Sequence, residues 1–247
     1  MFFFFPFALP VFCLVAIYLI AALLPGCLLL RYVWKKDRVE KESPALLGLL
    51  LKGGLFAAIV SLVLEGVGMA VLILNLSLDP QSSVGVLLTA FLVVAAVEEG
   101  GKFFFLKRYT WYNQEFDHLF DGVVYAAFVS MGFAMVENVK YVFVSGLSVA
   151  LPRAVLSVPA HLGFSVFMGI FYGLAKKADV QGRKGLQKLL LCLSWLLSTL
   201  LHGFYDGCLM QGTVESMLLF WLFVIAMYVI VISLLRFTSD HDQSLWG

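Results

Sequence analysis

Seven apolar runs, each long enough to cross a lipid bilayer, limit the folds open to this chain. A helix advances about 1.5 Å per residue, so about 20 apolar residues cross a hydrocarbon core of roughly 30 Å. The runs predict spans at Phe7–Leu30, Gly53–Leu76, Val84–Leu106, Asp121–Val144, Leu151–Ala175, Lys188–Met210 and Ser216–Arg236. We therefore expect an all-α fold, a polytopic transmembrane helix bundle of about seven spans.

The composition supports a membrane protein with one domain. Apolar residues make up 62% of the chain and charged residues only 13%, whereas soluble domains carry about 25% charged residues. The formal net charge of +1 gives no indication of a nucleic-acid partner. We expect a single domain over residues 1–247, with the informative motifs between about 84 and 210. The oligomeric state is left open.

Basic residues fall in alternate loops and orient the bundle. Arg153 is almost alone on one side, while the other side carries Arg31, Lys35, Lys36, Arg38, Lys41, Lys107, Arg108, Lys176, Lys177, Arg183, Lys184, Lys188 and Arg236. Cytoplasmic loops are enriched in Lys and Arg, so the N-terminus is expected outside and the C-terminus inside. The N-terminal stretch has no basic region and no A-x-A cleavage site, and is therefore interpreted as the start of a retained first helix.

Ionisable side chains inside the apolar runs indicate a functional site. Glu98 and Glu99 are adjacent in the third run, and Glu137, His161 and His202 lie at a comparable depth in three other runs. Burying an ionised carboxylate in lipid costs several kcal/mol, so such residues usually face a cavity and serve a function. Acids and histidines at one level are typical of a site that handles protons, water or a metal ion.

Helical spacing predicts two pairs within this group. Glu98 and Lys102 are separated by four residues and should share a face, while Glu99 should point about 100° away. Lys102 could then neutralise one carboxylate. His202 and Asp206 have the same spacing, so the Asp206 carboxylate could orient the imidazole.

Other residues are interpreted as structural. Pro159 should free the carbonyl of Val155 and bend the fifth helix beside His161. Gly169 and Gly173 form a GxxxG spacing that favours close helix packing. Glu65 is expected to be a hydrogen-bonded structural acid, and Lys140 to pair with Glu137 or reach the membrane surface. The cysteines lack a CxxC spacing and are expected in the core: Cys13, Cys27, Cys192 and Cys208.

Familiar protease motifs are missing from the chain. It has neither the HExxH of a zinc protease nor a GxGD motif. Ser165 follows His161 by one turn of the same helix, which is a poor geometry for a serine–histidine dyad.

Five blocks in order resemble the PrsW family, which is grouped with the CAAX prenyl endopeptidases and Abi proteins. The resemblance covers roughly residues 95–210. The blocks are Glu98-Glu99-x-x-Lys102, Phe120-Asp121-Gly122-x-x-Tyr125, Glu137-Asn138-x-x-Tyr141, His161 in AHLGFSVFMG, and His202-x-x-Tyr205-Asp206.

The resemblance implies an intramembrane endopeptidase of the bacterial cytoplasmic membrane. Its partners would be the lipid bilayer and a membrane-anchored protein substrate, such as a single-pass anti-sigma factor cleaved in a stress response. The expected catalytic residues are Glu98, Glu99, His161, His202 and Asp206. The expected supporting residues are Lys102, Asp121, Tyr125, Glu137, Asn138 and Tyr141.

The implied mechanism leaves two questions open. Glu98 and His161 would activate a water, and His202 with the residue four positions later would stabilise the oxyanion. That residue is Asp206, where related enzymes often carry asparagine, and an ionised aspartate cannot donate a hydrogen bond. No cofactor is assumed, although Glu98, His161 and His202 could bind zinc.

Two other function classes compete with a protease. A proton-coupled transporter also uses buried acids and histidines, but should show internal repeats, and none is apparent. A non-catalytic scaffold or immunity-like protein would be favoured by loss of Glu98, His161 or His202, and all three are present.

Overall fold

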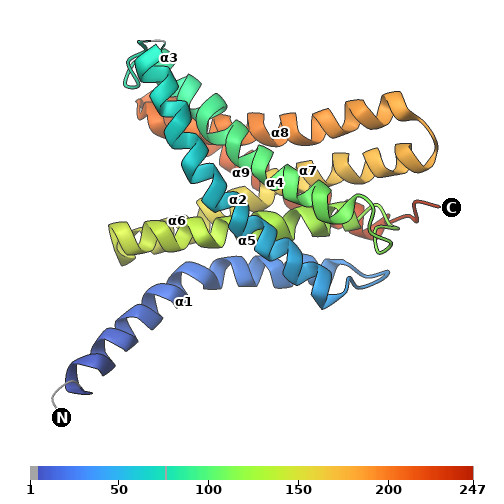
Figure 1. Ribbon diagram of the computed structural model, residues 1–247, viewed down its shortest axis with the longest axis horizontal. Helices are drawn as coiled ribbons and strands as arrows, with labels where there is room; N and C mark the ends of the chain where they lie inside the picture. Colours follow the sequence, from blue (N-terminus) through green and yellow to red (C-terminus); the bar gives the residue numbers. More distant parts are fainter. Residues whose placement is uncertain (1–4, 76, 247) are drawn as a thin grey trace.

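The computed structural model describes residues 5–75 and 77–246, and it confirms an all-helical membrane protein (Figure 1). Within these residues, seven helical segments are long and apolar enough to cross a membrane. The expected end of the second span at Leu76, and the first four residues of the expected N-terminal helix, lie outside the described residues.

The helices follow one another with short connections. The first two spans are α1 (Phe5–Lys36) and α2 (Pro44–Ala70), which ends in the π-helical turn η1 (Val71–Asn75). The third comprises α3 (Ser83–Leu88), the π-helical η2 (Thr89–Ala95) and α4 (Ala96–Thr110). The others are α5 (Asp121–Ser145), then η3 (Leu147–Val149) with α6 (Ala150–Val155) and α7 (Ser157–Val180), then α8 (Lys184–Gln211) and α9 (Val214–Asp240).

Several spans are longer than the apolar runs suggested, because capping residues set their ends. The second span begins at Pro44, nine positions before the expected Gly53, since the Ser43 side chain accepts a hydrogen bond from the Leu46 amide and Pro44 suits the first helical turn. At the end of α8, Gly212 adopts a left-handed conformation with φ of 62°.

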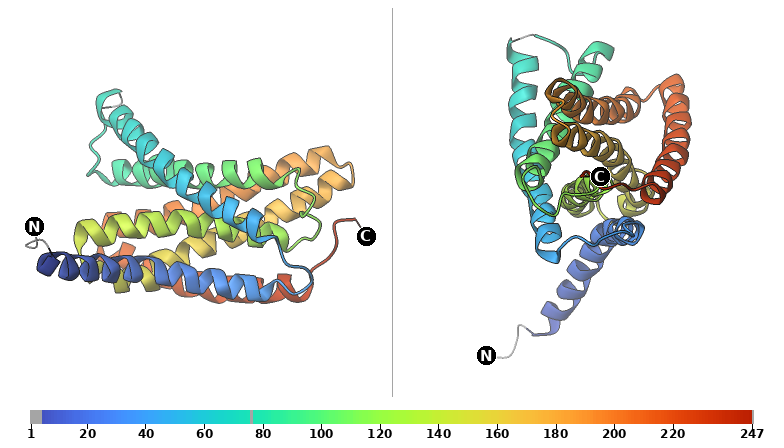
Figure 2. Two further views of the ribbon diagram at one scale, coloured as in Figure 1. Left: turned by 60° about the horizontal axis from the view of Figure 1, so that its bottom comes forward. Right: turned by 90° about the vertical axis from the view of Figure 1, so that its right-hand side faces the viewer.

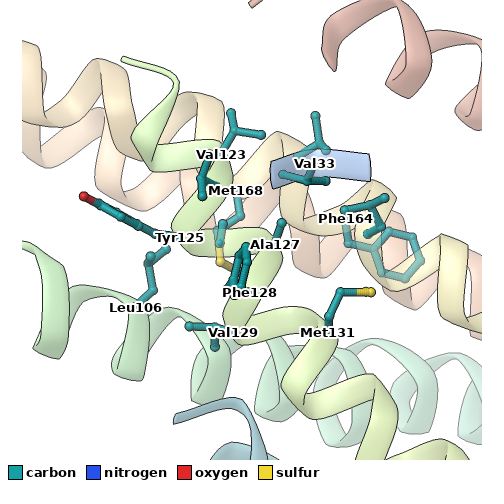
Figure 3. Packing of buried hydrophobic residues seen from close by; sticks show 14 of the residues in the cluster. Val33, Leu106, Val123, Tyr125, Ala127, Phe128, Val129, Met131, Phe164 and Met168 are labelled. Atoms are coloured by element: carbon teal, nitrogen blue, oxygen red, sulfur yellow. The ribbon is translucent and has the colours of Figure 1, made fainter. Parts of the chain in front are cut away.

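The central helix is α5, which runs through the middle of the bundle (Figure 2). Small residues allow α5 to lie this close to α7. A Cβ added to Gly122 would lie only 2.6 Å from the Gly169 carbonyl oxygen of α7, so a larger residue would not fit without a shift. The expected close packing at Gly169 is therefore confirmed, with α5 as its partner. Figure 3 shows Val123 and Met131 of α5 packed beside other buried side chains.

The fifth span is broken beside the expected bend. Leu156 interrupts the helix between α6 and α7, three residues before Pro159. Because Pro159 has no amide hydrogen, the Val155 carbonyl lacks its usual partner, and the Tyr228 hydroxyl of α9 donates to it at 2.6 Å. The bend is thus held by a side chain from another helix.

The two faces of the bundle differ in the number of Lys and Arg residues at the helix ends beside them. We call one the basic face: it carries the α1–α2 loop (residues 37–43), the α4–α5 loop (111–120), the α7–α8 turn and the C-terminal tail (241–246). The tail packs on the α4–α5 loop, since the Leu245 amide donates to the Asp117 carbonyl at 2.7 Å. The opposite face carries the turns after η1, α5 and α8, and the two chain ends lie on opposite sides (Figure 1).

The expectation that all four cysteines lie in the core was wrong. Only Cys208 is buried, whereas Cys13, Cys27 and Cys192 are exposed on the outside of the bundle. Lipid is as apolar as a protein core, so a small apolar side chain is not driven inward in a membrane protein.

Candidate active site

Helix α4 contributes a buried acid–base group. Glu99 and Lys102 are 0% and 1% exposed, and Lys102 Nζ lies 2.7 Å from Oε1 of Glu99. Glu98 is also buried, and its Oε2 lies 3.5 Å from the same ammonium. Lys102 therefore pairs with both glutamates. The expectation that Glu99 would point away was wrong, because a spacing of three residues also brings side chains onto one helix face.

His202 of α8 joins this group through both ring nitrogens. Its Nδ1 lies 2.8 Å from Oε1 of Glu99, and its Nε2 lies 3.3 Å from Oδ2 of Asp206 and 3.9 Å from Oε2 of Glu98. Since the Glu99 carboxylate accepts, Nδ1 carries a proton. The structure thus brings together the expected His202–Asp206 pair and places both beside Glu98.

His161 of α7 stands between a cation and an anion. Lys102 Nζ lies 3.1 Å from its Nδ1, and Oε2 of Glu137 lies 2.9 Å from its Nε2. An ammonium can only donate, so Nδ1 accepts and the ring proton is on Nε2, pointing to Glu137. The two imidazole rings are perpendicular, with centroids 5.2 Å apart.

Arg153 completes the wall around Glu137. Its Nη2 lies 2.9 Å from Oε2 of Glu137 and its Nε lies 2.8 Å from Oδ1 of Asn138, while the guanidinium covers the Tyr141 ring at 3.9 Å. Lys140, expected to pair with Glu137 or to reach the membrane surface, is exposed, and its Nζ lies over the Tyr141 ring at 5.3 Å. One feature of the sequence pointed to Arg153: it is nearly the only basic residue on its side of the bundle.

A cavity of about 590 Å³ opens onto these groups. Glu98 and His202 line one part, His161 and Glu137 another, and Asp206, Tyr141 and Arg153 are also in its wall. Helix α2 closes the cavity with Ala58, Ile59, Leu62 and Glu65. Glu65, interpreted from the sequence as structural, therefore faces the same space as the candidate catalytic groups.

Two expected supporting residues lie elsewhere. Asp121 and Tyr125 are near the basic face, where Oδ2 of Asp121 accepts from the His118 amide at 2.7 Å and the Tyr125 hydroxyl donates to Glu42 at 2.7 Å. They hold the α4–α5 loop and the start of α2 rather than the cavity. Both residues lie in the first turns of α5, about three to four turns before Glu137, so they are too far along the helix to reach the cavity.

The donor set suits a metal ion. Glu98, Glu99, His161 and His202 each offer one ligand atom, and these atoms lie within 4.8 Å of one another. Two histidines with a glutamate form a common catalytic zinc site. Among the described residues, Oε2 of Glu98 and Oε2 of Glu99 are buried without a hydrogen-bond partner, a cost that a cation would offset. Lys102 already contacts Glu99 and His161. The side chains most available to a metal ion are therefore Glu98 and His202, which line the cavity.

Comparison with known proteins identifies the family. Residues 41–234 match the model of the PrsW family of intramembrane metalloproteases. The chain is 35% identical to a protein named Protease PrsW from Geobacillus kaustophilus, over 77% of this chain and 78% of that protein. It is 32% identical to the Protease PrsW of Bacillus subtilis over 83% and 88% of the two chains, and 27% identical to that of Oceanobacillus iheyensis over 90% and 95%. No solved structure matches the chain.

These matches cover the helices that carry the cavity and its acids and histidines, and with the seven membrane-spanning segments they indicate a multi-pass protein of a bacterial membrane. The scaffold and transporter alternatives are set aside, because the relatives are named as proteases. The chain belongs to the PrsW family and is an intramembrane protease.

Proposed function

We propose that the cavity hydrolyses a peptide bond of a membrane-anchored protein, with Glu98 as the general base. One observation carries the proposal: Glu98 lines the cavity together with two histidines, and its Oε2 is buried without a hydrogen-bond partner among the described residues. Glu99 differs, since Lys102 and His202 both hold its Oε1 behind that wall. We therefore assign the reaction to Glu98 and a positioning role to Glu99.

The proposed reaction moves one proton in two steps. Glu98 removes a proton from a water while the water oxygen bonds to the carbonyl carbon of the substrate. The protonated Glu98 then gives that proton to the amide nitrogen as the carbon–nitrogen bond breaks. We place the water between Glu98 and the His161–Glu137 pair, because all three line the cavity.

The developing oxyanion is assigned to His202. Its Nδ1 donates to Glu99, so Nε2 is the nitrogen left for the substrate. Oδ2 of Asp206 lies 3.3 Å from this Nε2. A proton held between Nε2 and Asp206 would be available to an oxyanion. In this proposal Asp206 acts as the partner of the imidazole, a role that an aspartate can fill where related enzymes often have asparagine.

A metal ion fits the same residues. Glu98, His161 and His202 would hold it, and His161 would then give up its contact with Lys102 or with Glu137. A bound metal would lower the pKa of a coordinated water and polarise the substrate carbonyl. In that case Lys102 balances the negative charge of Glu99. The same contact keeps the Glu99 carboxylate directed at His202.

The substrate class follows from the site's position. The acids and histidines lie within membrane-spanning helices, so the cleaved segment must enter the bundle from the bilayer and unwind locally. The basic face is assigned to the cytoplasm because the helix ends beside it carry most of the Lys and Arg residues, which puts the N-terminus outside. We assign a single-pass anti-sigma-factor-like protein as substrate.

The test is cleavage of a tagged single-pass substrate by the purified protease in proteoliposomes. Glu98→Gln should insert stably and lose at least about 100-fold in cleavage rate, because an amide cannot accept the water's proton. Glu215→Gln is the matched control, since Glu215 is exposed at the start of α9. Full cleavage by the Glu98→Gln variant would exclude Glu98 as the base. Adding a chelator to the wild-type reaction separates metal-dependent cleavage from glutamate–histidine cleavage.

A further inference from the structure

A second group of potential metal ligands lies on the basic face, outside the membrane-spanning helices. Glu40 of the α1–α2 loop, with Asp117 and His118 of the α4–α5 loop, each offer one ligand atom, and these atoms lie within 4.8 Å of one another. His118 Nδ1 is 2.7 Å from Oδ1 of Asp117, which fixes the ring and leaves Nε2 for another partner.

A buried carboxylate beside this group lacks a partner. Asp37 is only 1% exposed, and among the described residues its Oδ2 has no hydrogen bond. Asp37 lies three residues before Glu40 in the same loop. An unsatisfied buried carboxylate oxygen is costly, and a bound cation would offset that cost.

Nearby basic side chains are engaged elsewhere. The Lys41 ammonium donates to the backbone carbonyls of Trp34 and Asp37. Arg38 pairs with Asp240 at 3.0 Å on the exposed surface. The carboxylates of the cluster outnumber these two cations, so the cluster has a surplus of negative charge.

We propose that Glu40, Asp117 and His118, with Asp37, form a binding site for a divalent transition-metal ion such as Zn²⁺ or Mn²⁺. One imidazole with several carboxylates suits these ions better than Mg²⁺ or Ca²⁺, which prefer oxygen ligands alone.

The ion would act as a structural clamp. It would join the loop after α1 to the loop before α5, and so add to the hydrogen bonds that the Ser43 amide and hydroxyl already donate to the Glu115 carboxylate. The C-terminal tail is tied to the same place, because Leu245 donates to the Asp117 carbonyl and His118 pairs with Ser244 along the backbone. This site is separate from the cavity, so its metal would stabilise the fold without taking part in cleavage.

The experiment uses the purified full-length chain in detergent, stripped of metal and titrated with ZnCl₂ or MnCl₂. Bound metal is measured by mass spectrometry and the midpoint of thermal unfolding is followed. We expect saturating metal to raise the midpoint by about 5 °C or more in the wild type. His118→Asn and Glu40→Gln should each lose this rise and one equivalent of metal. His241→Asn is the matched control, since its exposed imidazole lies in the same tail outside the cluster, and it should behave as the wild type.

A double variant, Glu98→Gln with His202→Asn, distinguishes this site from the cavity. It should retain the thermal rise and the equivalent of metal that His118→Asn loses. Glu40 is exposed, so Glu40→Gln tests the site without disturbing a buried contact. The proposal is overturned if Glu40→Gln and His118→Asn bind as much metal as the wild type, or if the cavity double variant alone abolishes the thermal rise.

Discussion

Glu99 and His202 are joined by a 2.8 Å contact between Oε1 and Nδ1, and the same oxygen lies 2.7 Å from Lys102 Nζ. One carboxylate oxygen therefore links α4 to α8 and fixes the imidazole that faces the cavity. Charge-assisted contacts of this length are strong when they are shielded from water.

Glu99→Gln should destabilise the protein, because it leaves the buried Lys102 ammonium without its nearest anion. Removing one member of a buried ion pair typically costs about 3–5 kcal/mol of unfolding free energy. Reversible unfolding in mixed micelles would measure the loss. Glu99→Gln combined with Lys102→Met should recover part of it, since the ammonium that lost its nearest anion is then removed as well. Strictly additive losses in the double variant would contradict the proposed pair.

Arg153→Ala should slow cleavage by about 10- to 100-fold, the range found when an outer partner of a catalytic group is removed. Arg153 holds Glu137, and Glu137 accepts from the Nε2 proton of His161. Because Arg153 acts through these residues, kcat should fall more than KM rises. Arg153→Lys should restore part of the rate.

Lys140→Ala is the control for Arg153, since Lys140 lies at the same cavity but is exposed and only covers the Tyr141 ring. It should keep a rate close to that of the wild type. Equal effects of the two substitutions would indicate that only the charge at the cavity matters, and not the contact with Glu137.

Gly122→Ala should destabilise the bundle by about 1–3 kcal/mol, the usual cost of overpacking. The added Cβ would meet the Gly169 carbonyl oxygen at 2.6 Å, and a backbone atom cannot move aside without shifting α7. Gly185→Ala is the control, because nothing lies within 4 Å of a Cβ there. It should be neutral or stabilise α8 by up to about 1 kcal/mol. Similar unfolding midpoints for the two variants would refute close α5–α7 packing.

Stability should fall as the pH rises from about 5 to 8, because burial raises the pKa of Glu42 to about 7. In the folded state Glu42 keeps its proton up to about pH 7, whereas in the unfolded chain it releases the proton at a lower pH. The stability present at low pH is therefore lost as the pH rises through about 7. Glu42→Gln keeps an acceptor for the Tyr125 hydroxyl and removes the titration. Thermal midpoints at pH 5 and 8 should converge in that variant. An unchanged difference would assign the pH dependence to another group.

The sequence was sufficient for the fold class and for much of the cavity. Span number depends on local hydrophobicity and length, which are properties of consecutive residues, so seven spans could be predicted. Within one helix, the 3.6-residue period correctly predicted that His202 lies beside Asp206 and that Glu98 lies beside Lys102. The bend at Pro159 was also predictable, because proline lacks the amide hydrogen that the Val155 carbonyl requires.

Contacts between helices required the tertiary structure. Nothing local distinguishes Arg153 from a surface cation or Glu65 from a structural acid. Arg153 contacts Glu137 of another helix, and Glu65 lines a cavity whose acids and histidines come from other helices. Glu99 was misplaced for the same reason: helix geometry allows it to face several neighbours, and His202 decides which. Short-range periodicity thus determined which side chains share a helix face, and the packing of small residues around α5 decided which of those faces meet.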